Sequence, residues 1–156
     1  FTTLVPNLGV VGYDDGKSFV VADIPGLIEG AHEGHGLGHK FLRHVTRTDL
    51  LIHLLDSSNI DENDPLAPWR NINRELALFD PELGNKPQVV VANKIDLPEG
   101  RAKAELFGRN LPQGSRPLWT ISAATTEGVA ALVQYIGTKL EAIKQQNETA
   151  CESAGP

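Results

Sequence analysis

The sequence has no methionine among its 156 residues and only one cysteine, Cys151. Because translation starts with methionine, we expect that a segment before Phe1 was removed or that the chain is a piece of a longer protein. A single cysteine excludes an internal disulfide framework and is typical of a reducing compartment. The sequence therefore predicts a cytoplasmic protein.

Long apolar runs and an excess of positive charge are also lacking. No run approaches the ~20 apolar residues of a membrane-spanning helix, and no signal peptide opens the chain. The net charge of -6 argues against free-standing, charge-driven binding of nucleic acid. The length and the 40% share of hydrophobic residues are typical of one globular domain, for which we expect a monomer.

Short apolar runs alternate with segments of helical periodicity, which predicts an α/β domain with a mostly parallel sheet and helices on both faces. Five glycines between residues 26 and 38 predict a mobile stretch, because each costs about 1 kcal/mol in a helix. A loop is predicted over residues 81–87. Residues 145–156 are polar and lack an apolar face, which predicts a disordered tail. Strands are predicted over 8–12, 17–22, 49–56, 88–92 and 118–121, and helices over 39–48, 69–79, 99–107 and 126–144.

Polar side chains follow three of these strands, at the sheet edge where ligands bind in such folds. The second and third of these strand ends carry Asn93-Lys94-x-Asp96 and Ser122-Ala123. The Asp96 carboxylate can accept two hydrogen bonds from the adjacent N–H and NH₂ groups of guanine, which adenine lacks. The Lys94 stem can lie along the base, Asn93 can tie neighbouring loops together, and the Ser122-Ala123 backbone N–H can contact the guanine carbonyl oxygen.

The first strand end carries Asp23-Ile24-Pro25-Gly26, which suits a site for Mg²⁺ and phosphate. A carboxylate can hold Mg²⁺ through a water, since Mg²⁺ keeps several of its waters. The Gly26 N–H can approach a terminal phosphate without interference from a Cβ. Thr2 and Thr3 are candidates for hydroxyl ligation of the Mg²⁺.

Each of these patterns also has a purely structural interpretation. The Asn93–Asp96 run could be a polar turn with a helix cap, and Asp23–Gly26 a turn that ends a strand. Trp69 and Trp119 are interpreted as packing residues rather than as platforms for bases. Four histidines are clustered, His32, His35, His39 and His44, with His53 nearby. Their spacing matches no standard zinc pattern, so the surface of a mobile switch and a helix is favoured over a metal site.

Together with the runs FTTLVPNLGVV (1–11), DIPGLIEGAH (23–32), GLG (36–38) and FLRH (41–44), these strand ends resemble the GTPase domain of the bacterial Obg family over residues 1–144. The resemblance implies a Ras-like fold that binds GTP or GDP with Mg²⁺, hydrolyses GTP, and acts in large (50S) ribosomal subunit assembly and the stringent response. It implies Mg²⁺ ligation by Thr3, in preference to Thr2, and by Asp23 through water. It also implies catalysis by Thr3 and Gly26, and nucleotide binding by Asp23, Pro25, Gly26, Asn93, Lys94, Asp96, Ser122 and Ala123.

The sequence departs from that family in one large respect, because it has no G-x-x-x-x-G-K-[ST] phosphate loop. In the family this loop lies upstream of Thr2, between a central strand and a helix. We therefore expect a partial domain that lacks its first strand, phosphate loop and first helix, and that is not a competent GTPase alone. Leu27 stands where many Ras-like GTPases have a water-orienting glutamine, which predicts slow intrinsic hydrolysis in the intact protein.

A second hypothesis stays open beside the GTPase. The chain could be a non-hydrolysing module that has lost its phosphate loop and binds the ribosome. A phosphate-loop motif within ~30–40 residues before Phe1 favours the enzyme.

Overall fold

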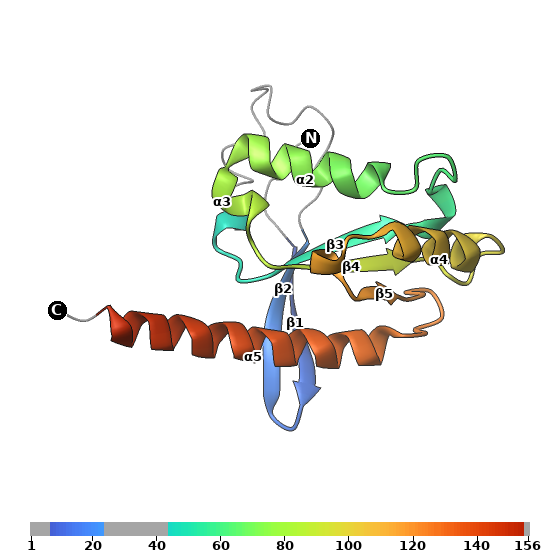
Figure 1. Cartoon of the computed structure of the whole chain (residues 1–156). Helices are drawn as coiled ribbons and strands as arrows, with labels where there is room; N and C mark the ends of the chain where they lie inside the picture. The colour runs from blue at the N-terminus through green and yellow to red at the C-terminus, as the bar shows by residue number, and fades with distance from the viewer. Residues whose placement is uncertain (1–6, 24–43, 155–156) are drawn as a thin grey trace.

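The computed structural model of the chain describes residues 7–23 and 44–154. The predicted glycine-rich stretch and most of the predicted helix 39–48 lie outside these residues. The elements run in the order β1 (Asn7–Asp14), β2 (Lys17–Asp23), β3 (Leu51–Asp56), η2 (Ser57–Asn59), α2 (Ala67–Phe79), α3 (Pro81–Gly84), β4 (Gln88–Asn93), α4 (Gly100–Asn110), η3 (Gln113–Ser115), β5 (Leu118–Thr120) and α5 (Val129–Ser153) (Figure 1).

The core forms around β4, the central strand of a parallel sheet ordered β3-β4-β5. Its valine run is buried on both faces, as the near-continuous apolar sequence predicts. On one face, Val90 forms a buried cluster with Leu55 of β3 and Phe107 of α4, and Trp69 of α2 packs against this cluster. Val89 and Val91 pack on the opposite face against α5 (Figure 1). Helices on both faces of a parallel sheet are therefore confirmed.

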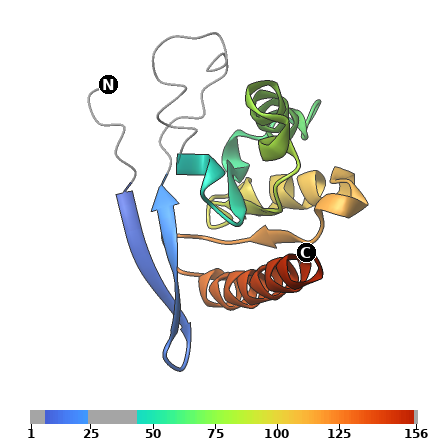
Figure 2. The same ribbon diagram turned by 90° about the vertical axis from the view of Figure 1, so that its left-hand side faces the viewer.

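The first two strands form an antiparallel hairpin beside this sheet (Figure 2). The Tyr13 hydroxyl donates to Glu141 of α5 at 2.6 Å, and the Lys17 ammonium pairs with the same carboxylate at 2.9 Å. The hydrogen bond from Tyr13, followed by that from Lys17, lowers the pKa of Glu141. Gly137 lies under the Tyr13 ring, where an added Cβ would come within 2.2 Å of ring carbon. α5 is thus the element that holds the hairpin.

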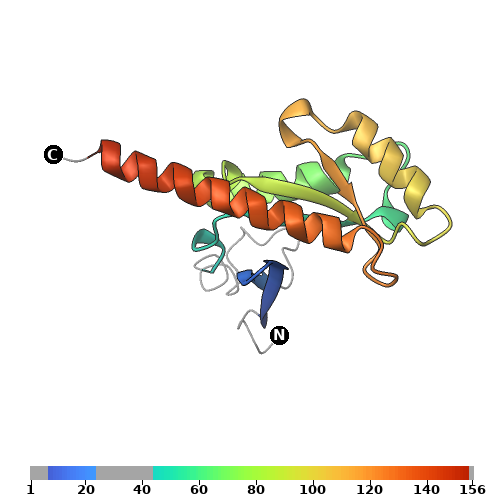
Figure 3. The same cartoon turned by 90° about the horizontal axis from the view of Figure 1, so that it is seen from below.

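The described strands form two sheets, where the sequence predicted one. Ile52 and Leu54 of β3 pair with Val89 and Val91 of β4, so all four side chains share one face. α5 covers the two valines, which are 3% and 0% exposed, whereas Ile52 and Leu54 are 39% and 57% exposed. Seen from below, α5 runs along β4 (Figure 3). β3 therefore carries two uncovered apolar side chains on the α5 face of the sheet, and its outer edge pairs with no described strand.

Two segments differ from the sequence prediction. α5 continues through Ser153, so the expectation of a disordered tail at 145–156 is wrong up to that residue. The reason is that these residues are polar but include good helix formers, with no glycine or proline before 155, and the Thr149 hydroxyl bonds back to the Gln145 carbonyl oxygen. Residues 81–84 form a short helix in place of a loop, because Pro81 follows an Asp80 carboxylate that caps the Glu82 N–H.

His53 of β3 is a buried imidazole, 8% exposed, whose Nδ1 finds no hydrogen-bond partner among the described residues. Burial lowers its pKa from 6.5 to about 4. The unfolded chain therefore binds a proton between these values while the folded chain does not, and stability falls as the pH falls from 6.5 to 4. We expect about 3 kcal/mol of the free energy of unfolding to be lost over this interval, from 1.36 kcal/mol per pKa unit.

Urea unfolding followed by circular dichroism from pH 7 to pH 4 measures this loss. His53→Leu, which keeps an apolar side chain at the site, should flatten the pH dependence, and the difference between the two curves isolates His53 from the carboxylates. Parallel curves for the two proteins would show that His53 titrates alike in the folded and unfolded chain.

Candidate functional site

The carboxyl ends of β3, β4 and β5 meet at one edge of the parallel sheet. Beyond the last residue pair of β4 and β5, two further backbone bonds join the chain segments after these strands. The Ile121 N–H donates to the Ala92 carbonyl oxygen at 2.9 Å, and the Ile95 N–H donates to the Ile121 carbonyl oxygen at 3.3 Å. The Ser57 hydroxyl, from η2 after β3, donates to the Asn93 carbonyl oxygen at 2.5 Å. These bonds bring the loops after all three strands together, as the alternation of elements predicts.

Side chains from two of the predicted motifs are joined directly. The Asn93 amide oxygen accepts from the Ala123 N–H at 2.9 Å, which confirms that Asn93 ties the two loops together. The Ser122 hydroxyl donates to the Asp96 carboxylate at 2.7 Å and itself accepts from the Thr125 N–H. Ser122 is fully buried and Asp96 is exposed, so a buried hydroxyl fixes a carboxylate that faces solvent.

Both backbone N–H groups predicted to face a guanine carbonyl oxygen donate within the protein. The Ser122 N–H bonds to the Glu127 carbonyl oxygen at 3.0 Å, and the Ala123 N–H bonds to Asn93. Ala123 is exposed while Ser122 is buried. An incoming base could therefore share or take over only the Ala123 donor.

Lys94 has a left-handed backbone with φ of 69°, which is uncommon for a residue with a side chain. Its ammonium forms an ion pair of 2.6 Å with Asp56, the last residue of β3. The hydrogen bonds from Lys94 and from the Ser58 hydroxyl lower the pKa of the Asp56 carboxyl. The negative charge of Asp56 therefore persists to lower pH than that of an ordinary aspartate.

Two glycines let the loops of the site approach the elements behind them. A Cβ on Gly100, at the start of α4, would lie 2.2 Å from the Lys94 carbonyl oxygen. Gly128, before α5, has φ of 76°, and a Cβ there would lie 2.5 Å from the Thr120 carbonyl oxygen. Larger residues at either place would push the Lys94 loop or the Ser122 loop out of position.

The phosphate side of the predicted site is described only at Asp23. It is the last residue of β2 and is exposed. Thr2, Thr3, Pro25, Gly26 and Leu27 lie outside the described residues. Within 7–23 and 44–154, no three acidic, histidine or cysteine side chains gather as a metal site. A lone carboxylate is compatible with Mg²⁺ that is held mainly by the phosphates of a nucleotide, which is its usual mode.

Sequence reasoning missed the last residue of β3 and the two residues that follow it. Asp56, Ser57 and Ser58 all contact the Asn93–Asp96 loop or one another. The rule of inspecting strand ends would have found Asp56, since it closes an apolar run. Trp69 and Trp119 pack against the core on opposite faces of the sheet, which confirms them as packing residues.

Comparison with known proteins gives the family. A family described as "50S ribosome-binding GTPase" matches residues 1–94. The chain is 57% identical over 136 residues to GTPase Obg of Moorella thermoacetica, covering 87% of the chain and 32% of that protein. It is 51% identical over 145 residues to GTPase Obg of Alkaliphilus oremlandii and 54% identical over 140 residues to that of Roseiflexus castenholzii. These cover 93% and 90% of the chain and 34% and 32% of the relatives.

The chain thus spans about a third of the length of these curated relatives. In the described part of the chain, no helix combines the length and apolar character needed to cross a membrane. The family match and the parallel sheet flanked by helices confirm the predicted Ras-like α/β fold. The chain therefore belongs to the family of 50S ribosome-binding GTPases, and its relatives place it with the Obg GTPases.

Proposed function

We propose that this chain supplies the guanine-recognition half of a GTP-binding and GTP-hydrolysing domain. The observation that carries the proposal is the junction of Asn93, Asp96 and Ser122 at one sheet edge. A carboxylate fixed by one buried hydroxyl keeps its remaining lone pairs for the adjacent N–H groups of guanine. Adenine offers an acceptor where guanine offers a donor, so it would leave the carboxylate unpaired.

The phosphate side of the proposed site follows from the resemblance and from Asp23. Mg²⁺ would be held by Asp23 through water and by Thr3, and its charge would offset charge that develops on the transferred phosphoryl group. Gly26, next to Pro25, would place its N–H against the terminal phosphate. Leu27 cannot orient water through its side chain, so we propose a slow intrinsic rate.

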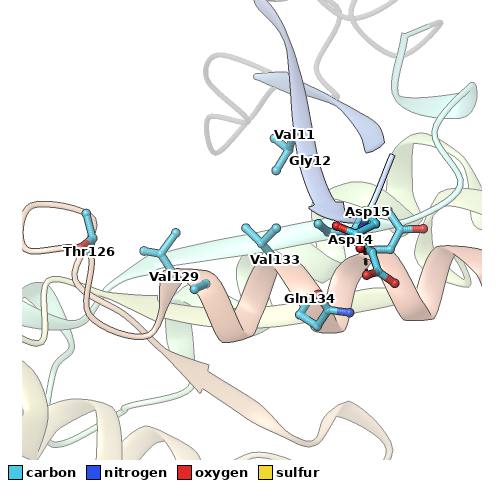
Figure 4. A pocket seen from close by; sticks show the side chains of 10 residues that line it. Val11, Gly12, Asp14, Asp15, Thr126, Val129, Val133 and Gln134 are labelled. Atoms are coloured by element: carbon cyan, nitrogen blue, oxygen red, sulfur yellow. Dashed lines mark hydrogen bonds between the residues drawn. The ribbon is translucent and has the colours of Figure 1, made fainter. Parts of the chain in front are cut away.

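We propose that a segment outside these 156 residues brings the phosphate loop, one strand and one helix. The strand would pair with the free edge of β3, and the helix would cover Ile52 and Leu54. A separate groove of about 810 Å³ lies between the hairpin and α5, and no residue of β3 lines it. Figure 4 shows its lining, with Val129, Val133 and Gln134 on α5 and with Val11, Asp14 and Asp15 on the hairpin.

The partner and location of the whole protein are proposals from its relatives. We propose a cytoplasmic, monomeric protein that acts on the large (50S) ribosomal subunit, in keeping with the family name. The non-hydrolysing, ribosome-binding module remains the second candidate, because the chain has no phosphate-loop motif. It requires the same ribosomal partner without turnover of GTP.

Guanosine without phosphates tests the base site on this chain alone. We expect guanosine, and not adenosine, to shift the backbone amide NMR signals of Asp96 and Ala123, because base recognition needs no phosphate loop. A well-dispersed spectrum of the free chain is the control for folding. Equal shifts with both nucleosides, or shifts remote from these loops, would contradict the proposed function.

A further inference from the structure

Both oxygens of the Asp56 carboxylate accept hydrogen bonds. One oxygen accepts from the Ser58 N–H at 3.0 Å and from the Ser58 hydroxyl at 2.6 Å. The other accepts from the Asn59 amide at 3.1 Å and from the Lys94 ammonium at 2.6 Å. In the parallel ladder Asp56 lies opposite Asn93. The carboxylate is therefore fixed next to the loop that carries the proposed base site.

Lys94 is held at both of its ends. Its carbonyl oxygen accepts from the Leu97 N–H at 3.1 Å and lies against Gly100, which leaves no room for a Cβ. Its ammonium is held by Asp56. A free lysine side chain samples many rotamers, and ordering it opposes binding. With both ends fixed, the aliphatic stem of Lys94 is ordered before any ligand arrives.

Stability does not account for a charge at position 56. The side chains of Lys94 and Asp56 are 51% and 27% exposed, and exposed ion pairs contribute little to folding. The cap of η2 needs only an acceptor for the Ser58 N–H, which a neutral asparagine supplies as well as an aspartate. Among the hydrogen-bond donors that hold Asp56 in the described part of the chain, only Lys94 carries a charge. The negative charge therefore acts on the lysine.

We propose that Asp56 is a positioning residue for nucleotide binding, which holds Lys94 extended across the ends of β3 and β4 so that its stem lies ready to receive the flat face of the base. This inference rests on the proposed function of the site. Asp56 would then influence the affinity for nucleotide, whereas Asp96 would set the preference for guanine. The reason is that an aliphatic stem packed on the face of a base makes no hydrogen bonds to the edge that distinguishes one base from another.

The Asp56→Asn variant tests this assignment in the intact protein that contains the chain, with fluorescent GDP as the probe. We expect affinity for GDP and GTP to fall about tenfold, the difference equivalent to 1.4 kcal/mol. The preference for guanine over xanthine nucleotides and the value of kcat should stay unchanged. Asp64→Asn is the matched control, because it breaks the exposed 2.7 Å ion pair between Asp64, which follows η2 in the chain, and Arg70 of α2.

A double-mutant cycle shows whether Asp56 acts through the lysine. In a Lys94→Gln background, Asp56→Asn should cause no further loss, because the group that it positions is gone. Unchanged affinity in Asp56→Asn, or the same tenfold loss in both backgrounds, would overturn the assignment while leaving guanine binding intact. A parent protein that does not prefer GDP to ADP would overturn the proposed function and this inference together.

Discussion

The Asp96→Asn variant of the intact protein is expected to bind XTP in preference to GTP. Asp96 uses one oxygen to accept from the Ser122 hydroxyl at 2.7 Å. Asparagine can keep that bond through its amide oxygen, which places its NH₂ group where the second carboxylate oxygen was. A donor at this place repels the N–H groups of guanine and suits the second carbonyl oxygen of xanthine. The substitution thus inverts one hydrogen bond and leaves the loop as it is.

The expected change in the ratio of GTP to XTP affinity is roughly 10³-fold or more, since a site that hydrogen-bonds a substrate group discriminates strongly against its absence. Competition of GTP and XTP against fluorescent GDP measures the ratio. Asp64→Asn serves again as a substitution of the same type on an exposed aspartate outside the site. An unchanged affinity for GTP would remove Asp96 from base recognition.

The Ser122→Ala variant separates the orientation of Asp96 from its charge. It removes the buried hydroxyl that fixes the carboxylate and that accepts from the Thr125 N–H. GTP affinity should fall with no gain for XTP, because the acceptor remains but is no longer held. A gain of XTP binding in this variant would indicate that loop movement, rather than the chemistry at residue 96, sets the preference.

The residues of the base site could be predicted from the sequence because they lie in two short segments, each directly after an apolar strand. Asn93, Lys94 and Asp96 follow one apolar strand, and Ser122 follows the next, so the parallel order alone brings them to one edge. The bond between Asn93 and Ala123 follows from the same order. No sequence rule gives the direction of each donor, and for this reason the internal bond of the Ser122 N–H was not foreseen.

Other features depend on contacts between distant residues. The left-handed backbone of Lys94 lies close to Gly100 and its ammonium pairs with Asp56, and neither residue is part of the motif. The hairpin lies on α5 because the Tyr13 ring packs against Gly137 and its hydroxyl bonds to Glu141, two residues that are far from Tyr13 in the sequence. The polar composition of 145–156 predicts little packing, yet helix propensity along a continuous helix is enough to extend α5.

The largest effect on activity is expected from joining this chain to the phosphate-loop segment proposed above. The chain alone should not turn over GTP, because it has no phosphate-loop lysine to contact the phosphates and no hydroxyl after it to bind Mg²⁺. With a segment that bears G-x-x-x-x-G-K-[ST] ahead of Phe1, release of phosphate from GTP should become measurable and stay slow. Leu27 is the reason for the low rate, since it cannot hydrogen-bond the attacking water.

The same segment should stabilise the fold. Burial of a branched apolar side chain contributes about 1.5–3 kcal/mol, and Ile52 and Leu54 are the exposed pair of β3. Covering them should raise the free energy of unfolding by about 1.5–3 kcal/mol, since the exposed parts of the two side chains together amount to about one whole side chain. Urea unfolding of the chain with and without the segment measures this gain.

A segment whose phosphate-loop lysine is replaced by alanine separates the two effects. It should restore stability in full and leave hydrolysis at the level of the chain alone, because the lysine contacts phosphate and not the sheet. The ribosome-binding module makes a different prediction, namely that even the unaltered segment brings no hydrolysis. Turnover by the 156-residue chain at the rate of the joined protein would contradict both hypotheses, since each requires that these residues lack a phosphate site.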